Sequence, residues 1–152
     1  MTGIPTEHRE KLSGVGKIAL IVAIGCGAFL RLYALDNQSL WLDEINTVVP
    51  AMFGMSISET MSYTPPSPPL YFMIIQAWAT IGGYSEFWLR LPTALLGIAA
   101  LPLFFLGLRR TFDPESAAIA TILLALSWPA IFYAQEVRAY GAVLFTMALA
   151  VP

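Results

Sequence analysis

Two adjacent carboxylic acids, Asp43 and Glu44, follow the first long apolar run of the chain. On a helix, adjacent side chains point about 100° apart, so the two acids seldom bind one ligand. One of them can face a reaction cavity while the other accepts hydrogen bonds from the backbone or binds a metal ion. A carboxylate partly desolvated at a membrane boundary has a raised pKa and suits general-base catalysis. The alternative is a solvated helix N-terminus, where acids interact favourably with the helix dipole.

A second group of charged side chains, Glu136 and Arg138, lies far along the chain. Residues two apart do not face each other on a helix, so an intrahelical ion pair does not explain them. Glu136 could supply oxygen ligands to a divalent cation or hold a partner base, and Arg138 could bind a phosphate through its forked donors. Arg90 is a second candidate for phosphate binding. Alternatively, Arg90 lies at the end of a span and extends its guanidinium to the membrane surface without a functional role. The neighbouring Tyr133 and Tyr140 are also typical of a membrane interface.

The composition indicates a membrane protein. Of the 152 residues, 57% are hydrophobic and 12% are charged, whereas soluble domains contain about a quarter charged residues. The net charge of −2 comes without a basic cluster, so nucleic-acid binding is not expected. A single cysteine, Cys26, allows no disulfide within the chain, and a single histidine, His8, argues against a histidine-based metal site or catalytic triad.

Apolar runs of about 20 residues predict helices that cross a bilayer, and a run of about 13 predicts an interfacial or buried helix. The first run is too long for the core of a signal peptide, so an uncleaved anchor is expected. The elements predicted in this way are spans at about 15–35, 89–108, 116–134 and 139–152, and an interfacial helix at about 69–81.

Local signals fix two of the boundaries. Asp113, followed by Pro114 and an acid, predicts a helix N-terminus, with aspartate as the cap and proline in the first helical position. The prolines between Tyr63 and Leu70 predict a rigid turn that introduces the interfacial helix at a fixed angle.

The distribution of basic residues predicts the topology, because lysine and arginine near span ends mark the cytoplasmic side. The N-terminal tail, residues 1–14, and the loop at Arg109 and Arg110 are therefore expected to be cytoplasmic. The long loop 36–88 is then extracytoplasmic, together with the loop that carries Glu136. Both groups of candidate residues are predicted to meet on that outer side.

With these residues in place, the chain resembles the N-terminal part of membrane glycosyltransferases of the GT-C fold. More specifically, it is similar to the dolichyl-phosphate-mannose-protein mannosyltransferase-like group, which includes the bacterial lipid A aminoarabinose transferases. The resemblance runs from about residue 31 to the end. Four motifs in this order carry it, with spans between them: QSLWLDE at 38–44, PPLYF at 68–72 with Trp78, SEFWLRLP at 85–92 and YAQEVRAY at 133–140.

The resemblance implies an all-α, polytopic transmembrane bundle with juxtamembrane helices in the first outer loop. It also implies a sugar donor linked to a polyprenyl phosphate, and a protein, lipid or glycan acceptor on the extracytoplasmic face of a bacterial plasma membrane. In this interpretation the catalytic acids are Asp43, as base, and Glu44, in support. The substrate-binding residues are Arg90, Arg138, Tyr71 and Tyr140, and a divalent metal cation could be held by Asp43 and Glu136.

The chain departs from the family pattern at one motif position and in its length. Ser67 stands where many relatives have a histidine, so a role for that imidazole cannot be transferred. Family members are several hundred residues long, so this chain is expected to be a fragment that holds part of the site and is inactive alone. The alternative is a non-enzymatic membrane subunit or a piece of a transporter, although a transporter is expected to bury acids inside its spans.

Overall fold

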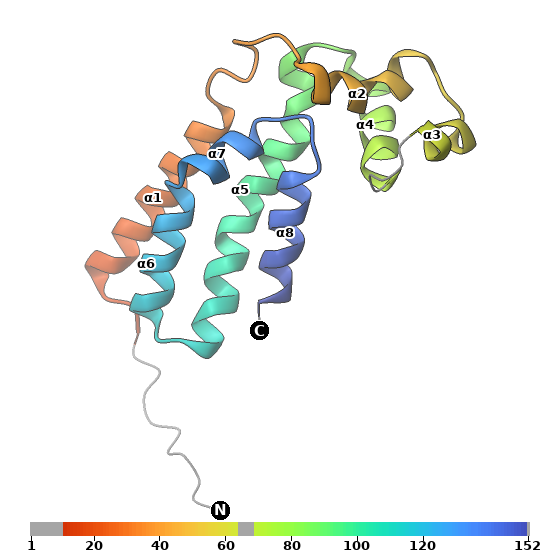
Figure 1. Ribbon diagram of the computed structural model, residues 1–152. Helices are drawn as coiled ribbons and strands as arrows, with labels where there is room; N and C mark the ends of the chain where they lie inside the picture. Colours follow the sequence, from red (N-terminus) through yellow and green to blue (C-terminus); the bar gives the residue numbers. More distant parts are fainter. Residues whose placement is uncertain (1–10, 64–68, 152) are drawn as a thin grey trace, which may run out of the picture.

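The computed structural model describes residues 11–63 and 69–151, and every regular element in these ranges is a helix. Apolar helices lie side by side as a bundle, and three shorter helices form a cap that projects from one end of it (Figure 1). The prediction of an all-α fold is therefore confirmed for the described chain. The predicted proline turn, at 64–68, falls outside the described residues, as does most of the N-terminal tail.

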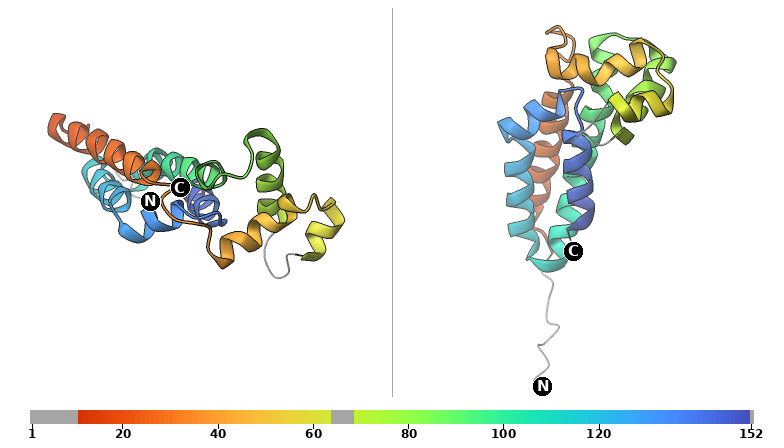
Figure 2. Two further views of the ribbon diagram at one scale, coloured as in Figure 1. Left: turned by 90° about the horizontal axis from the view of Figure 1, so that it is seen from above. Right: turned by 45° about the vertical axis from the view of Figure 1, so that its right-hand side comes forward.

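The bundle consists of α1 (Gly14–Leu32), α5 (Glu86–Thr111), α6 (Pro114–Ala125) and α8 (Tyr140–Ala150). α1 and α6 run toward the cap, whereas α5 and α8 run away from it (Figures 1 and 2). In the described chain, α1 and α5 are long and apolar enough to cross a membrane, and the bent pair α6 and α7 (Trp128–Ala134) would make a third span. α8 has only 11 residues, so the predicted count of four crossings stays a prediction.

The third predicted span is not one continuous helix, because α6 and α7 meet at an angle of 57°. Pro129 has no N–H and its ring clashes with the carbonyl four residues earlier, which ends α6 at Ala125. Arg31 of α1 supplies the missing donors. Its Nη1 donates to the carbonyl of Ala125 at 2.9 Å, and its Nη2 donates to that of Leu124 at 3.4 Å. The buried arginine thus satisfies the carbonyl of Ala125 and adds a second donor to that of Leu124, which also accepts the backbone N–H of Ser127.

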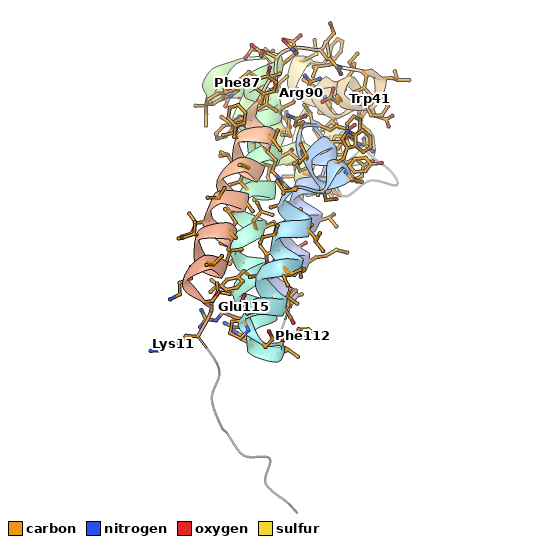
Figure 3. The ribbon with its side chains drawn as sticks, turned by 90° about the vertical axis from the view of Figure 1, so that its left-hand side faces the viewer. Lys11, Trp41, Phe87, Arg90, Phe112 and Glu115 are labelled. Atoms are coloured by element: carbon orange, nitrogen blue, oxygen red, sulfur yellow. The ribbon has the colours of Figure 1, made fainter. Side chains whose placement is uncertain are left out.

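The predicted start of α6 is confirmed. The side chain of Asp113 accepts the backbone N–H of Ser116 at 2.9 Å, and Pro114 is the first helical residue. Glu115 in the same turn accepts the backbone N–H of Ser13 at 2.8 Å, and Ser13 is itself the N-cap of α1. These contacts hold the starts of α1 and α6 together at the end of the bundle opposite the cap (Figure 3).

The cap contains α2 (Leu42–Met52), α3 (Ile57–Tyr63) and α4 (Pro69–Gly82). The helix predicted at 69–81 is therefore present as α4. Its apolar side chains pack with those of α2, the start of α5 and the loop before α8. The buried members of this core are Val48, Ala51, Tyr71, Ile75, Ala79, Leu89 and Val137.

A tryptophan pair joins α4 to the start of α5. The rings of Trp78 and Trp88 stack with their centroids 4.5 Å apart. Each indole N–H also donates to the other residue's carbonyl, at 2.9 and 3.1 Å. Gly82 leaves room for this arrangement, because a Cβ there would lie 2.1 Å from the Trp88 ring.

Candidate functional site

Asp43 and Glu44 occupy the first turn of α2, and the helix places them in different environments. Glu44 is completely buried, whereas Asp43 is partly exposed. This separation follows from the angle between adjacent helical side chains. The two acids therefore differ in burial, and only Asp43 is accessible to solvent.

Glu44 is held by four hydrogen bonds from three separate segments. Its Oε1 accepts from Nε of Arg90 and from the backbone N–H of Val137, both at 2.9 Å. Its Oε2 accepts from Nη2 of Arg90 at 2.7 Å and from the backbone N–H of Trp41 at 3.3 Å. A carboxylate has about four lone-pair sites, and all of those of Glu44 are used.

Arg90 is equally occupied. Besides Glu44, it donates to the carbonyls of Leu35 at 2.6 Å, Gln38 at 2.8 Å and Ser39 at 3.4 Å. These five contacts account for all five N–H groups of the guanidinium. Figure 3 shows Arg90 at the cap end, between Phe87 and Trp41. The pair therefore fixes α2, α5 and the segment from Leu35 to Ser39 relative to one another.

The catalytic role predicted for Glu44 and the phosphate-binding role predicted for Arg90 stay predictions, and the geometry shows that both side chains are already occupied. Glu44 is predicted to support Asp43 in catalysis, and all of its lone pairs accept hydrogen bonds from the protein. Arg90 was expected to bind a phosphate, but it has no N–H left to donate. Their attraction offsets part of the cost of burying both charges, and loss of either partner would leave the other charge buried alone. Their arrangement is that of positioning residues.

Asp43 and Arg138, in contrast, have unused capacity. The carboxylate of Asp43 forms no hydrogen bond or ion pair with any residue that the structure describes. Arg138 is partly buried, and its Nη1 makes one long hydrogen bond, 3.4 Å, to the backbone carbonyl of Asp43. Within the described ranges, Arg138 makes no ion pair. An available acid and an available cation thus lie on neighbouring segments at the cap end of the bundle.

Glu136 is buried without a partner. Its residue is only 5% exposed, and neither carboxylate oxygen has a hydrogen-bond partner among the described residues. The pKa of Glu136 is raised, first because burial disfavours the charged carboxylate and then because Glu44 and Asp43 repel it. The positive charges of Arg138 and Arg90 act in the opposite direction.

Glu136 is one of the residues that line a cavity of about 510 Å³ at the cap end of the bundle. Its walls come from the end of α1, the segment that joins α1 to α2, and α7. The lining residues are Leu30, Tyr33, Ala34, Leu35, Asn37, Gln38, Ser39, Trp41, Glu44, Arg90, Ile131, Phe132, Gln135 and Glu136. The lining thus combines charged and amide side chains with aromatic and aliphatic ones at the cap end of the bundle.

The free oxygens of Glu136 fit a hard divalent cation, which prefers carboxylate and other oxygen ligands. Over 11–63 and 69–151, no three acidic, histidine or cysteine side chains come together as a metal site. A cation bound here would therefore take further ligands from the backbone, water or a phosphate. The paired role predicted for Asp43 and Glu136 stays a prediction.

The two tyrosines predicted to bind substrate lie in different settings. Tyr71 belongs to the buried core of the cap, and its hydroxyl hydrogen-bonds Thr93 of α5. Burial raises the pKa of this phenol, so the geometry gives Tyr71 a packing role instead. Tyr140 is 42% exposed at the start of α8, and its ring lies 4.7 Å from that of Tyr133. Tyr140 thus remains accessible.

The sequence predicted no role for two residues that hold helix ends near the cavity, Gln135 and Arg31. Gln135 donates to the carbonyls of Leu30 and Tyr33, each at 2.9 Å, and so completes the C-terminal end of α1. Arg31 holds the break between α6 and α7 in the same region. The sequence does contain a signal for the role of Arg31, because it lies inside an apolar run. A charge there is costly and requires a partner.

Comparison of the chain with protein-family models, with curated proteins and with solved structures found no match. The interpretation of the site therefore depends on its geometry and on the motifs in the sequence.

Proposed function

We propose that this chain forms part of the active site of an integral-membrane glycosyltransferase. Its donor is a sugar attached to a polyprenyl phosphate, and its acceptor is a protein, lipid or glycan on the extracytoplasmic face of a bacterial plasma membrane. The helices that are long and apolar enough to cross a bilayer support the membrane location. The family resemblance of the four motifs supports the substrate class.

One observation carries the proposal: the Glu44–Arg90 pair is fully satisfied, while the adjacent Asp43 and nearby Arg138 are not. Burial of a complete ion pair gives α2 a fixed position without consuming the acid beside it. Glycosyl transfer needs a base for the acceptor and a cation for the departing phosphate. Asp43 and Arg138 are of the required types, and both lie at the cap end.

In the proposed reaction, the carboxylate of Asp43 accepts the proton of the acceptor hydroxyl. The acceptor oxygen forms a bond to the anomeric carbon of the sugar, and the bond from that carbon to the phosphate oxygen breaks. The electron pair leaves with the polyprenyl phosphate, whose charge Arg138 stabilises through its N–H donors. A divalent cation held by Glu136 would supply additional charge neutralisation at the phosphate.

The test is a transfer assay in membranes that contain the complete protein, with a radiolabelled polyprenyl-phosphate sugar as donor. Asp43→Asn is expected to lower transfer by at least about 100-fold, the usual contribution of a general base. Arg138→Gln is expected to raise the KM for the donor. The matched control for the arginine is Arg110→Gln at the opposite end of the bundle. Full transfer activity of Asp43→Asn, with normal membrane insertion, would refute the assigned role.

A specific observation also favours a second candidate, a subunit that conducts ions. Glu136 is buried without a partner, as acids along an ion path are, although it lies in the loop between α7 and α8 and not inside a span. Under that hypothesis Glu136→Gln abolishes ion flux into vesicles, and Asp43→Asn has little effect. Under the transferase hypothesis no flux is measured, and Asp43→Asn has the larger effect on transfer.

A further inference from the structure

A second cavity, of about 460 Å³, lies at the end of the bundle opposite the cap. It opens between the start of α1 and the end of α5. Its basic lining residues are Lys11, Lys17 and Arg109, and its apolar ones include Leu20, Ile21 and Phe105. We call this cavity the basic groove. It is far along the bundle from the candidate site, because α1 and α5 separate the two ends (Figure 1).

The cations of the basic groove are available for a ligand. Lys11, Lys17 and Arg109 are exposed, and none of them makes an ion pair with a residue that the structure describes. Glu115, the acid labelled near Lys11 in Figure 3, already accepts a hydrogen bond from Ser13 and does not line the groove. Among the described residues, the lining of the groove therefore carries three positive charges and no carboxylate.

The groove has the same gradient of polarity on both of its helices. On α1, Leu20 and Ile21 follow Lys17 by three and four residues, so all three share one face. On α5, Phe105 precedes Arg109 by four residues, and the guanidinium lies 5.8 Å from the centre of its ring. Because the two helices run in opposite directions, both place the cation at the end of the bundle and the apolar side chain toward its middle (Figure 1).

We propose that the basic groove binds one anionic glycerophospholipid. Lys11, Lys17 and Arg109 bind the phosphate of the headgroup, and an acyl chain lies along Leu20, Ile21 and Phe105. A free phosphate would use only the basic rim and leave the apolar wall uncovered, whereas a phospholipid matches both parts. Basic pockets between membrane helices recognise lipid headgroups through the same combination of charge and apolar surface. This inference is independent of the proposed transferase activity.

The inference can be tested by native mass spectrometry of the detergent-purified protein. The probes are phosphatidylglycerol and phosphatidylcholine with identical acyl chains. Phosphatidylglycerol is expected to remain bound at lower lipid concentration. Lys17→Gln and Arg109→Gln are each expected to weaken its binding about fivefold, since a basic residue near an anionic lipid contributes on that scale.

Matched variants separate the groove from the rest of the surface. Arg110→Gln makes the same charge change outside the groove lining and is expected to retain binding. Ile21→Ser, within the groove, is expected to weaken binding more than Val22→Ser, and both positions are exposed enough to tolerate the change. Circular dichroism spectra of the variants are the control for correct folding.

Three results would overturn the inference. Equal retention of the two lipids would show that the charge is not recognised. Equal losses in Arg110→Gln and the groove variants would show that only overall charge matters. Displacement of phosphatidylglycerol by millimolar inorganic phosphate would show a free-phosphate site instead of a lipid site.

Discussion

Glu44 and Arg90 are 46 residues apart in sequence, yet they share two hydrogen bonds of 2.7 and 2.9 Å in the interior of the cap. The remaining hydrogen-bonding positions of both side chains are filled by backbone groups. Because Val137 also donates to Glu44, the pair connects the first turn of α2, the start of α5 and the loop before α8. The position of Asp43 and that of Glu136 both depend on it.

Removal of one member of this pair should destabilise the protein strongly. Glu44→Gln is expected to lower the free energy of unfolding by about 3–5 kcal/mol, since Arg90 would remain buried without its counter-charge. The measurement is an SDS titration in mixed micelles followed by circular dichroism. Asp43→Asn is the control, with little expected effect on stability, because that carboxylate has no partner among the described residues. Equal stability of the two variants would contradict the structural role of the pair.

Two glycines of α1 offer a matched test of helix packing. A Cβ at Gly27 would lie 2.8 Å from the carbonyl oxygen of Ala125, whereas a Cβ at Gly25 meets nothing within 4 Å. Gly27→Ala is expected to cost about 1–3 kcal/mol, because overpacking forces the helices apart. Gly25→Ala is expected to be neutral or slightly stabilising, since alanine is the better helix former. The difference in thermal midpoint between the two variants measures this contact.

The pH dependence of stability should reveal the state of Glu136. Because its pKa is raised in the folded protein, the folded state binds more protons than the unfolded state between the ordinary value of 4.5 and the raised value. Stability attributable to this group is therefore full at low pH and falls as pH rises through that window. Glu136→Gln is expected to remove this loss of stability. At pH values above the raised pKa, the variant is expected to be more stable than the wild type. Thermal midpoints from pH 4 to 8 test this, and parallel curves for both proteins would contradict it.

Accessibility of introduced cysteines should test the topology. Ser39 and Thr111 are exposed at opposite ends of the bundle. In a Cys26→Ser background, a membrane-impermeant maleimide applied to intact cells is expected to label Ser39→Cys and not Thr111→Cys. Permeabilised cells should show labelling of both. Labelling of Thr111→Cys in intact cells would place the basic end outside and reverse the predicted orientation.

Local information in the sequence was sufficient for the helices and several of their ends. The apolar runs predicted α1, α4 and α5, because a helix is the way to satisfy the backbone of an isolated segment in lipid. Asp113 and Pro114 predicted the start of α6, because a cap involves atoms only three residues apart. The break after Ala125 was missed, although Pro129 was visible, because the consequence of a proline depends on whether a neighbouring side chain can satisfy the freed carbonyl.

The sequence by itself determined that the chain is helical, strongly apolar and charged mainly at the helix ends. It also singled out the acids and arginines of the candidate site, since charges are few in such a composition. Only the tertiary structure decided which of them are already satisfied. Glu44 and Arg90 complete each other, while Asp43, Arg138 and Glu136 keep capacity for a ligand. Hydrogen-bond saturation depends on partners from distant segments, and no residue type or spacing encodes it.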